Sequence, residues 1–112
     1  MKKIFTGLEF YNYLRSSKSI GVFAGGEEAH MYATVDPDRL VIHQIGSKWL
    51  IEAEVLKTRR GVRGGGFDFY GETFECDIQT IEDVWGARRY TTQVVRINVG
   101  EKPTLLEIHL TS

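Results

Sequence analysis

The stretch 48-KWLIEAEVLKT-58 decides the fold class, because apolar and polar residues alternate along it. One parity holds the apolar side chains Trp49, Ile51, Ala53 and Val55. The opposite parity holds Glu52 and Glu54. A period of two is typical of a β-strand with one face on a core and the other in water, as in antiparallel sheets. We therefore expect a half-buried strand here and an antiparallel sheet around it.

Similar segments, bounded by turn residues, follow one another along most of the chain. Strands are predicted at 19–24, 29–35, 39–45, 67–79, 90–99 and 104–110, which makes about seven with 48–58. Asp36-Pro37-Asp38 has the composition of a type I turn. Phe67 and Phe69 differ in parity from Phe74, so a bulge or tight bend at Gly71 is expected to reset the register. Residues 80–89 are predicted to form a long loop or one helical turn.

One helix is predicted, near the amino terminus. Thr6-Gly7-Leu8-Glu9 has the spacing of a capping box, with Thr6 as the N-cap. At helical spacing a single apolar face would hold Ile4, Leu8, Phe10, Tyr11 and Leu14. The sequence therefore predicts an α+β fold that is mainly antiparallel β: a curved sheet or small β-sandwich with one N-terminal helix, forming a single domain over residues 1–112.

Composition restricts the functions to consider. The 112 residues are 42% apolar and 26% charged with a net charge of −1, which indicates a folded domain. A dedicated nucleic-acid binder usually has a positive surplus, which is absent here. The only cysteine, Cys76, has no intramolecular disulfide partner and is expected to be a small buried hydrophobe in a reducing compartment. Without a signal-peptide pattern or an apolar run of about 20 residues, we expect a cytoplasmic protein with no membrane partner.

Charges come in blocks. Residues 57–63 hold four cations, residues 68–83 hold six acids, and Arg88, Arg89 and Arg96 follow. The preferred interpretation is that neighbouring strands pair opposite charges across the sheet. The loop 59-RRGVRGGG-66 lacks the order of a phosphate-binding loop, which argues against a mononucleotide fold. It is interpreted as a soluble turn flanked by core phenylalanines; the alternative is an anion-gripping loop backed by stacking aromatics.

Catalysis and metal binding have weak signals. His30, His43 and His109 are the only histidines. His109-Leu110-Thr111 resembles one of the two His-x-Thr elements of two-histidine phosphoesterases, but the chain lacks the second. No metal-ligand spacing is present, so neither a metal nor another cofactor is expected.

Aromatic residues and arginines favour an interaction surface, and Trp85 and Tyr90 bracket Arg88 and Arg89; the alternative for Trp85 is a place in the core. The sequence thus favours a small soluble non-enzymatic binding protein that caps or inhibits another macromolecule. A toxin-immunity protein or phage inhibitor would be of this class, with acids meeting a toxin or a basic nuclease site. The expected protein-binding residues are Arg59, Arg60, Arg63, Tyr70, Glu72, Glu75, Asp77, Asp83, Trp85, Arg88, Arg89 and Tyr90.

The alternative is an RNA or single-stranded nucleic-acid binder, or a phosphodiester-cleaving enzyme that uses the basic loop with His109 and His30. A small-molecule binder with its ligand between sheet and helix is neither supported nor excluded by the sequence. The identity of the partner and the oligomeric state stay open.

Overall fold

A computed structural model describes residues 1–26, 29–58, 66–99 and 104–111. These residues form nine strands, one α-helix and one short 3-10 helix. In chain order the elements are β1 (Lys2–Thr6), α1 (Gly7–Arg15), β2 (Ser19–Gly26), β3 (Ala29–Val35), η1 (Pro37–Arg39), β4 (Val41–Ile45), β5 (Lys48–Thr58), β6 (Gly66–Gly71), β7 (Thr73–Trp85), β8 (Arg88–Val99) and β9 (Thr104–Thr111). The predicted α+β class, with an N-terminal helix and a curved antiparallel sheet, is confirmed.

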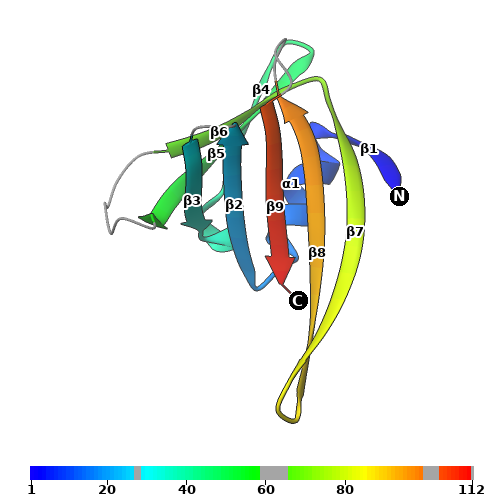
Figure 1. The fold of residues 1–112 in the computed structure, drawn as a ribbon. Coiled ribbons are helices and arrows are strands. Elements are labelled where there is room, and N and C mark those ends of the chain that lie inside the picture. The colour runs from blue at the N-terminus through cyan, green and yellow to red at the C-terminus, as the bar shows by residue number, and fades with distance from the viewer. Residues whose placement is uncertain (27–28, 59–65, 100–103, 112) are drawn as a thin grey trace.

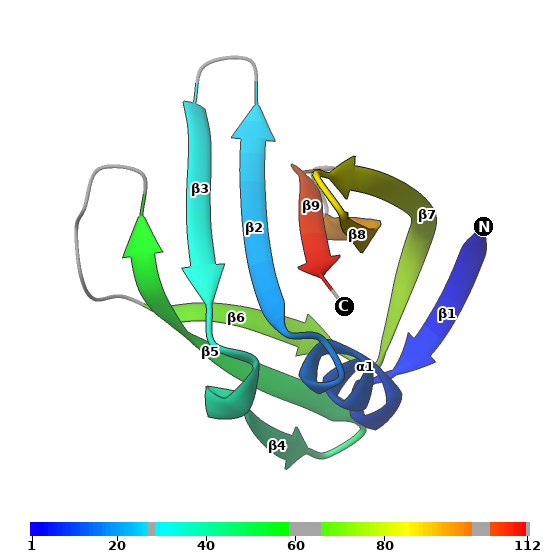
Figure 2. The same ribbon diagram turned by 90° about the horizontal axis from the view of Figure 1, so that it is seen from below.

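The strands pair in the order β1-β7-β8-β9-β2-β3-β5-β4, and β6 pairs with the other side of β5. All of these neighbouring strands are antiparallel, as predicted from the alternation. Figure 1 shows the front of the sheet, with α1 behind β8 and β9. Figure 2 shows the strands curling in an arc, with α1 between β1 and β5. The sheet is thus a half-barrel whose hollow side holds the helix.

Two strands go beyond the sequence prediction. The predicted strand 67–79 divides in two, because β6 pairs with β5 whereas β7 pairs with β1 and β8. β6 ends at Gly71, and a bend at Glu72 leads into β7, so of the two expected irregularities the bend is present and a bulge inside one strand is not. The other additional strand is β1, whose Ile4 was expected on the helix but lies 62% exposed.

The capping box forms as predicted. The Glu9 N–H donates to the Thr6 hydroxyl at 3.3 Å, and the Thr6 N–H donates to the Glu9 carboxylate at 3.1 Å. Phe10 and Leu14 are buried on the face toward the sheet, whereas Leu8 is exposed. The helix thus begins where its sequence indicates and contributes a narrower apolar face than expected.

An aromatic cluster holds the helix in the half-barrel. The fully buried ring of Phe10 stacks on Phe74 of β7 with centroids 4.9 Å apart. It also contacts Phe69 of β6 at 5.4 Å and Phe5 of β1 at 5.8 Å. Since β1 begins the strand order and β6 pairs with β5 near its other end, Phe10 joins opposite ends of the curled sheet.

Candidate functional site: a hairpin arm

The loop or helical turn predicted at 80–89 is wrong, because these residues continue β7 and β8 as a long hairpin. Gly86 adopts a φ of 62°, which glycine tolerates, and with Ala87 forms the two-residue turn between Trp85 and Arg88. We call residues 80–91 the arm. No other strand among the described residues pairs with it, because β9 last pairs with β8 at Thr92 and β1 reaches only Ile78. In Figure 1 the arm extends past the end of β9.

The arm exposes apolar side chains on both of its faces. Ile81 and Val84 are 46% and 61% exposed, and Tyr90 is 37% exposed. Strand alternation places Ile81 and Tyr90 on one face and Val84 on the other. A two-stranded hairpin is only marginally stable by itself in water, and grouped exposed apolar residues often mark interaction sites.

Charged residues of the arm lack partners within the described part of the chain. Glu82, Arg88 and Arg89 are exposed, and none forms an ion pair with another described residue. The predicted matching of opposite charges across neighbouring strands therefore does not extend to this hairpin. Its charges remain available to another molecule.

Five of the residues predicted for the interface gather on the arm: Asp83, Trp85, Arg88, Arg89 and Tyr90. Asp83 lies opposite Tyr90, and Trp85 lies opposite Arg88 across the turn. The sequence prediction omitted Ile81, Glu82 and Val84. No alternation marks them, because the apolar parity of Phe74, Cys76 and Ile78 stops at Thr80 and Ile81 has the opposite parity.

The other predicted interface residues lie elsewhere. Asp77 of β7 is six residues, or about 20 Å, from Asp83, and it accepts from the amino group of Met1 at 3.2 Å. Glu75 is exposed and lies opposite Ile4 of β1. Lys48 Nζ lies 5.4 Å from the centroid of the Tyr70 ring. The Glu72 carboxylate accepts a hydrogen bond from the Ser47 hydroxyl at 2.8 Å. Arg59, Arg60 and Arg63 lie outside the described residues.

A second polar group lies on the outer face of the sheet. Arg96 of β8 forms an ion pair with Glu107 of β9, with 3.3 Å between nitrogen and oxygen. The other oxygen of Glu107 lies 2.6 Å from His109 Nε2, and the Phe23 ring lies 4.6 Å from the imidazole. The contacts with His109 and Arg96 lower the pKa of Glu107, and the hydrogen bond with His109 contributes more than the one with Arg96. Cross-strand charge pairing is thus present here, although Arg96 pairs with Glu107 and not with Asp77, which lies opposite it in β7.

The histidines do not gather into a pair. His109 lies opposite Gly21 of β2, and His30 of β3 lies opposite Gly25 of the same strand. Four residues along β2 and two strand spacings separate their Cα atoms by about 16 Å. His43 is on β4, where it contacts Glu52 at 3.4 Å. This spacing does not favour the two-histidine arrangement considered from the sequence.

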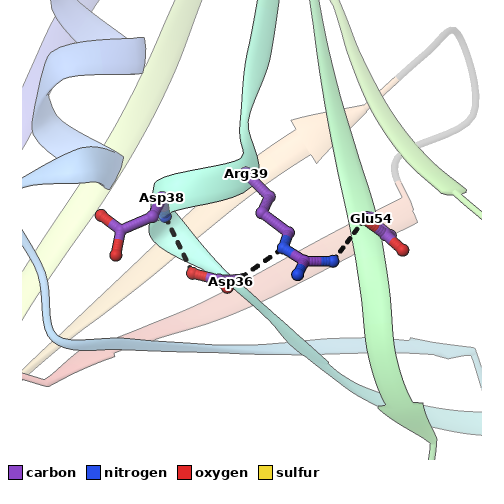
Figure 3. Close-up of polar contacts among 4 residues, drawn as sticks. All are labelled: Asp36, Asp38, Arg39 and Glu54. Carbon is purple, nitrogen blue, oxygen red and sulfur yellow. Dashed lines mark hydrogen bonds and ion pairs between the residues drawn. The ribbon is translucent and has the colours of Figure 1, made fainter.

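The polar groups of the turn at Asp36-Pro37-Asp38 contact one another and Arg39, as Figure 3 shows. The Asp36 carboxylate accepts from the Asp38 N–H at 2.9 Å, and its other oxygen lies 3.7 Å from Arg39. Arg39 also reaches Glu54 of β5 at 3.4 Å. Within the described ranges, no group of three or more His, Cys, Asp and Glu side chains is placed to hold a metal ion.

The expectations for two core residues are confirmed. Cys76 is buried, and burial raises the pKa of its thiol to about 12, so the reactive thiolate is disfavoured. Phe69 is also buried, in the aromatic cluster, and is therefore unavailable for stacking on a base. Of the aromatics considered for stacking, Tyr70 is exposed.

A hollow of about 480 Å³ lies beside β1 and is lined by Lys2, Lys3, Ile4, Glu75, Cys76, Asp77 and Arg96. It is at the edge of the sheet, not between the sheet and the helix where a small ligand was considered. A smaller hollow of about 190 Å³ lies between the end of α1 and β8, with Tyr13 and Gln93 in its wall. The Tyr13 hydroxyl donates a hydrogen bond to the Gln93 side-chain oxygen there.

Comparisons with models of protein families, with curated proteins and with solved structures gave no match for this chain. Among the described residues no helix has the length and apolar character needed to cross a bilayer. The fold and site define an α+β half-barrel from which one β-hairpin projects.

Proposed function

We propose that this protein is a small non-enzymatic binding protein that caps or inhibits another protein and docks on it through the arm. The observation that carries the proposal is the composition of this projecting hairpin. Ile81, Val84 and Tyr90 are exposed on it, and Glu82, Arg88 and Arg89 have no ion-pair partner among the described residues.

A protein partner suits the arm better than a nucleic acid. Acidic residues stand on β7 and arginines on β8, so a phosphate backbone would meet repulsion from Glu82 and Asp83. Aromatic and arginine side chains dominate protein–protein hot spots, and Tyr90 and Arg89 provide these types. Charges of both signs favour one orientation of the partner and raise the association rate.

Capping follows from the shape of the arm. A projecting hairpin can enter a concave surface, whereas a flat sheet face requires a flat partner. A toxin or a nuclease whose active site is basic would present such a surface to the acids of β7. A toxin-immunity protein or a phage inhibitor works in this way, and we place the protein in that functional class by proposal.

The test begins with capture of partners from the source organism by wild-type protein and by an arm variant, Val84→Ser with Tyr90→Ala. Both residues are exposed, so folding should be unaffected, and we expect the captured partner to bind the purified variant at least about tenfold more weakly, as for a hot-spot residue. The matched control is Ile45→Ser on β4, because Ile45 is 51% exposed but lies outside the arm. We expect it to bind like the wild type.

Equal partner binding by the arm variant and the wild type would contradict the proposal. Retention of RNA or single-stranded DNA at low salt, weakening steeply as salt rises, would instead support the nucleic-acid alternative.

A further inference from the structure

The outer edge of β7 in the arm has unpaired backbone groups. In a two-residue hairpin the residues that flank the turn, here Trp85 and Arg88, exchange backbone hydrogen bonds. Because this pattern alternates along an antiparallel pair, the N–H and C=O groups of Thr80, Glu82 and Val84 point away from β8. Ile78 has the same parity, and its N–H indeed donates away from β8, to the Met1 carbonyl at 2.8 Å.

Beyond Ile78 this edge has no neighbouring strand in the described part of the chain. β1 pairs with Thr73 to Asp77 and its last backbone contact is at Ile78, whereas β7 continues to Trp85. Thr80, Glu82 and Val84 therefore present N–H and C=O groups as a ladder without a partner. An open edge of this kind is a template for another strand.

We propose that an extended segment of the partner protein, bearing lysine or arginine, adds to β7 as a strand along residues 79–85. This inference rests on the proposed function and specifies its binding mode, β-strand addition. The added strand would lie next to β7, about 5 Å from it, and two strand spacings, about 10 Å, from β8. It would therefore meet Glu82 and Asp83 before Arg88 and Arg89, and its own charge should be positive.

A second copy of this chain suits the edge less well. Two β7 edges paired antiparallel about Glu82 would set this acid directly against its counterpart. Like charges directly opposite each other destabilise a strand pair. The outer edge of β8 is also covered further toward the turn, because β9 pairs with β8 as far as Thr92.

The test uses two end-blocked peptides of seven residues with the same alternating threonine and valine frame. One carries two lysines, the other two glutamates at the same positions. Hydrogen exchange of backbone amides, followed by NMR, should show that the lysine peptide at millimolar concentration protects the amides of Thr80, Glu82 and Val84. The amides of Ile81 and Asp83, which bond to β8, should change little. The lysine peptide should bind about three- to tenfold tighter, as one or two exposed ion pairs allow.

Proline variants of two residues that lie opposite each other give a matched pair. Proline has no N–H, and at an edge position that N–H is not part of the ladder. Val84→Pro should therefore abolish peptide binding through β7 and preserve the β7–β8 hairpin. Arg89→Pro blocks the free edge of β8 in the same way and should leave binding unchanged. Amide spectra of both variants check that the half-barrel stays folded.

Three results would overturn the inference: no protection of these amides by either peptide, loss of binding in Arg89→Pro but not in Val84→Pro, or protection that rises with protein concentration alone. The last result would indicate a second copy on the edge. Failure here is distinct from failure of the proposed function. If Val84→Ser with Tyr90→Ala still weakens partner binding while the peptides do not bind, the arm docks through its side chains and the edge is not used.

Discussion

The half-barrel around Phe10 and the arm are built from the same two strands, β7 and β8, yet they differ in what surrounds them. In the half-barrel these strands have neighbours on both sides, β1 and β9, and α1 packs on the inner face. In the arm each strand has only the other as neighbour among the described residues, and Ile81, Val84 and Tyr90 are exposed on its two faces. Buried apolar contacts stabilise the half-barrel. The arm has few such contacts, and its exposed side chains and backbone groups can bind a partner. One pair of strands thus serves both stability and interaction.

The largest expected effect comes from removing the ring that joins the two ends of the sheet. Phe10→Ala should lower the free energy of unfolding by about 3–5 kcal/mol, because it leaves a cavity among three aromatic neighbours. Val84→Ala in the arm should change it by no more than about 0.5 kcal/mol, as for other exposed positions. Denaturant unfolding of both variants, followed by tryptophan fluorescence, measures the difference.

A loss of several kcal/mol in Val84→Ala would break this distinction, since it would mean that the arm is packed in solution. A small loss in Phe10→Ala would mean that the helix contributes little to closing the half-barrel.

A smaller loss is expected where the helix begins. A Cβ added at Gly7 would overlap Cγ of Trp49 on β5. Gly7→Ala should therefore cost about 1–3 kcal/mol as an overpacked position, even though alanine favours a helix. The cost should shrink in a Trp49→Ala background, which a double-mutant cycle measures. An undiminished cost would trace the effect to the backbone of Gly7 and not to the tryptophan.

This contact illustrates what the sequence could and could not predict. The expected bounds of β3, residues 29–35, and of β5, residues 48–58, agree with the structure. So does the capping box at Thr6. These features depend on alternation or on residues three positions apart, and both can be read along the chain. The approach of Gly7 to Trp49 joins residues far apart in sequence, and no local pattern encodes it.

The arm escaped prediction for a different physical reason. A strand is recognised when one of its faces is apolar because that face is buried. Described side chains on both faces of the arm are exposed, and Glu82, Val84 and Arg89 are among them. Without a buried face the sequence need not alternate between apolar and polar residues, and it resembles that of a loop. The same property that hid the arm, its freedom from the core, makes it the best candidate for an interface. The charged and aromatic composition near Trp85 and Tyr90 is the reason why the sequence analysis proposed an interface in this segment, for which it predicted a loop or one helical turn.

The smallest expected effect concerns the acid response of the two regions. His109 and Arg96 lower the pKa of Glu107, so its ionised form stabilises the folded state. A lowered pKa gives stability that is present above the ordinary value of 4.5 and is lost as the pH falls below it. Glu107→Gln should thus cost about 1 kcal/mol or less at pH 7, as a partly exposed ion pair does. The difference from wild type should vanish in strong acid, where the wild-type carboxyl is also neutral.

Glu82→Gln is the matched change in the arm, where the carboxylate has no ion-pair partner among the described residues. Its unfolding curve should coincide with that of the wild type at both pH values. If Glu107→Gln lost as much stability in acid as at neutral pH, the cause would be packing or a neutral hydrogen bond, because charge no longer differs there. If Glu82→Gln instead showed a loss at neutral pH alone, the arm would have an ionic contact with the body of the protein. Its acids would then be engaged in folding and less free to meet a basic partner.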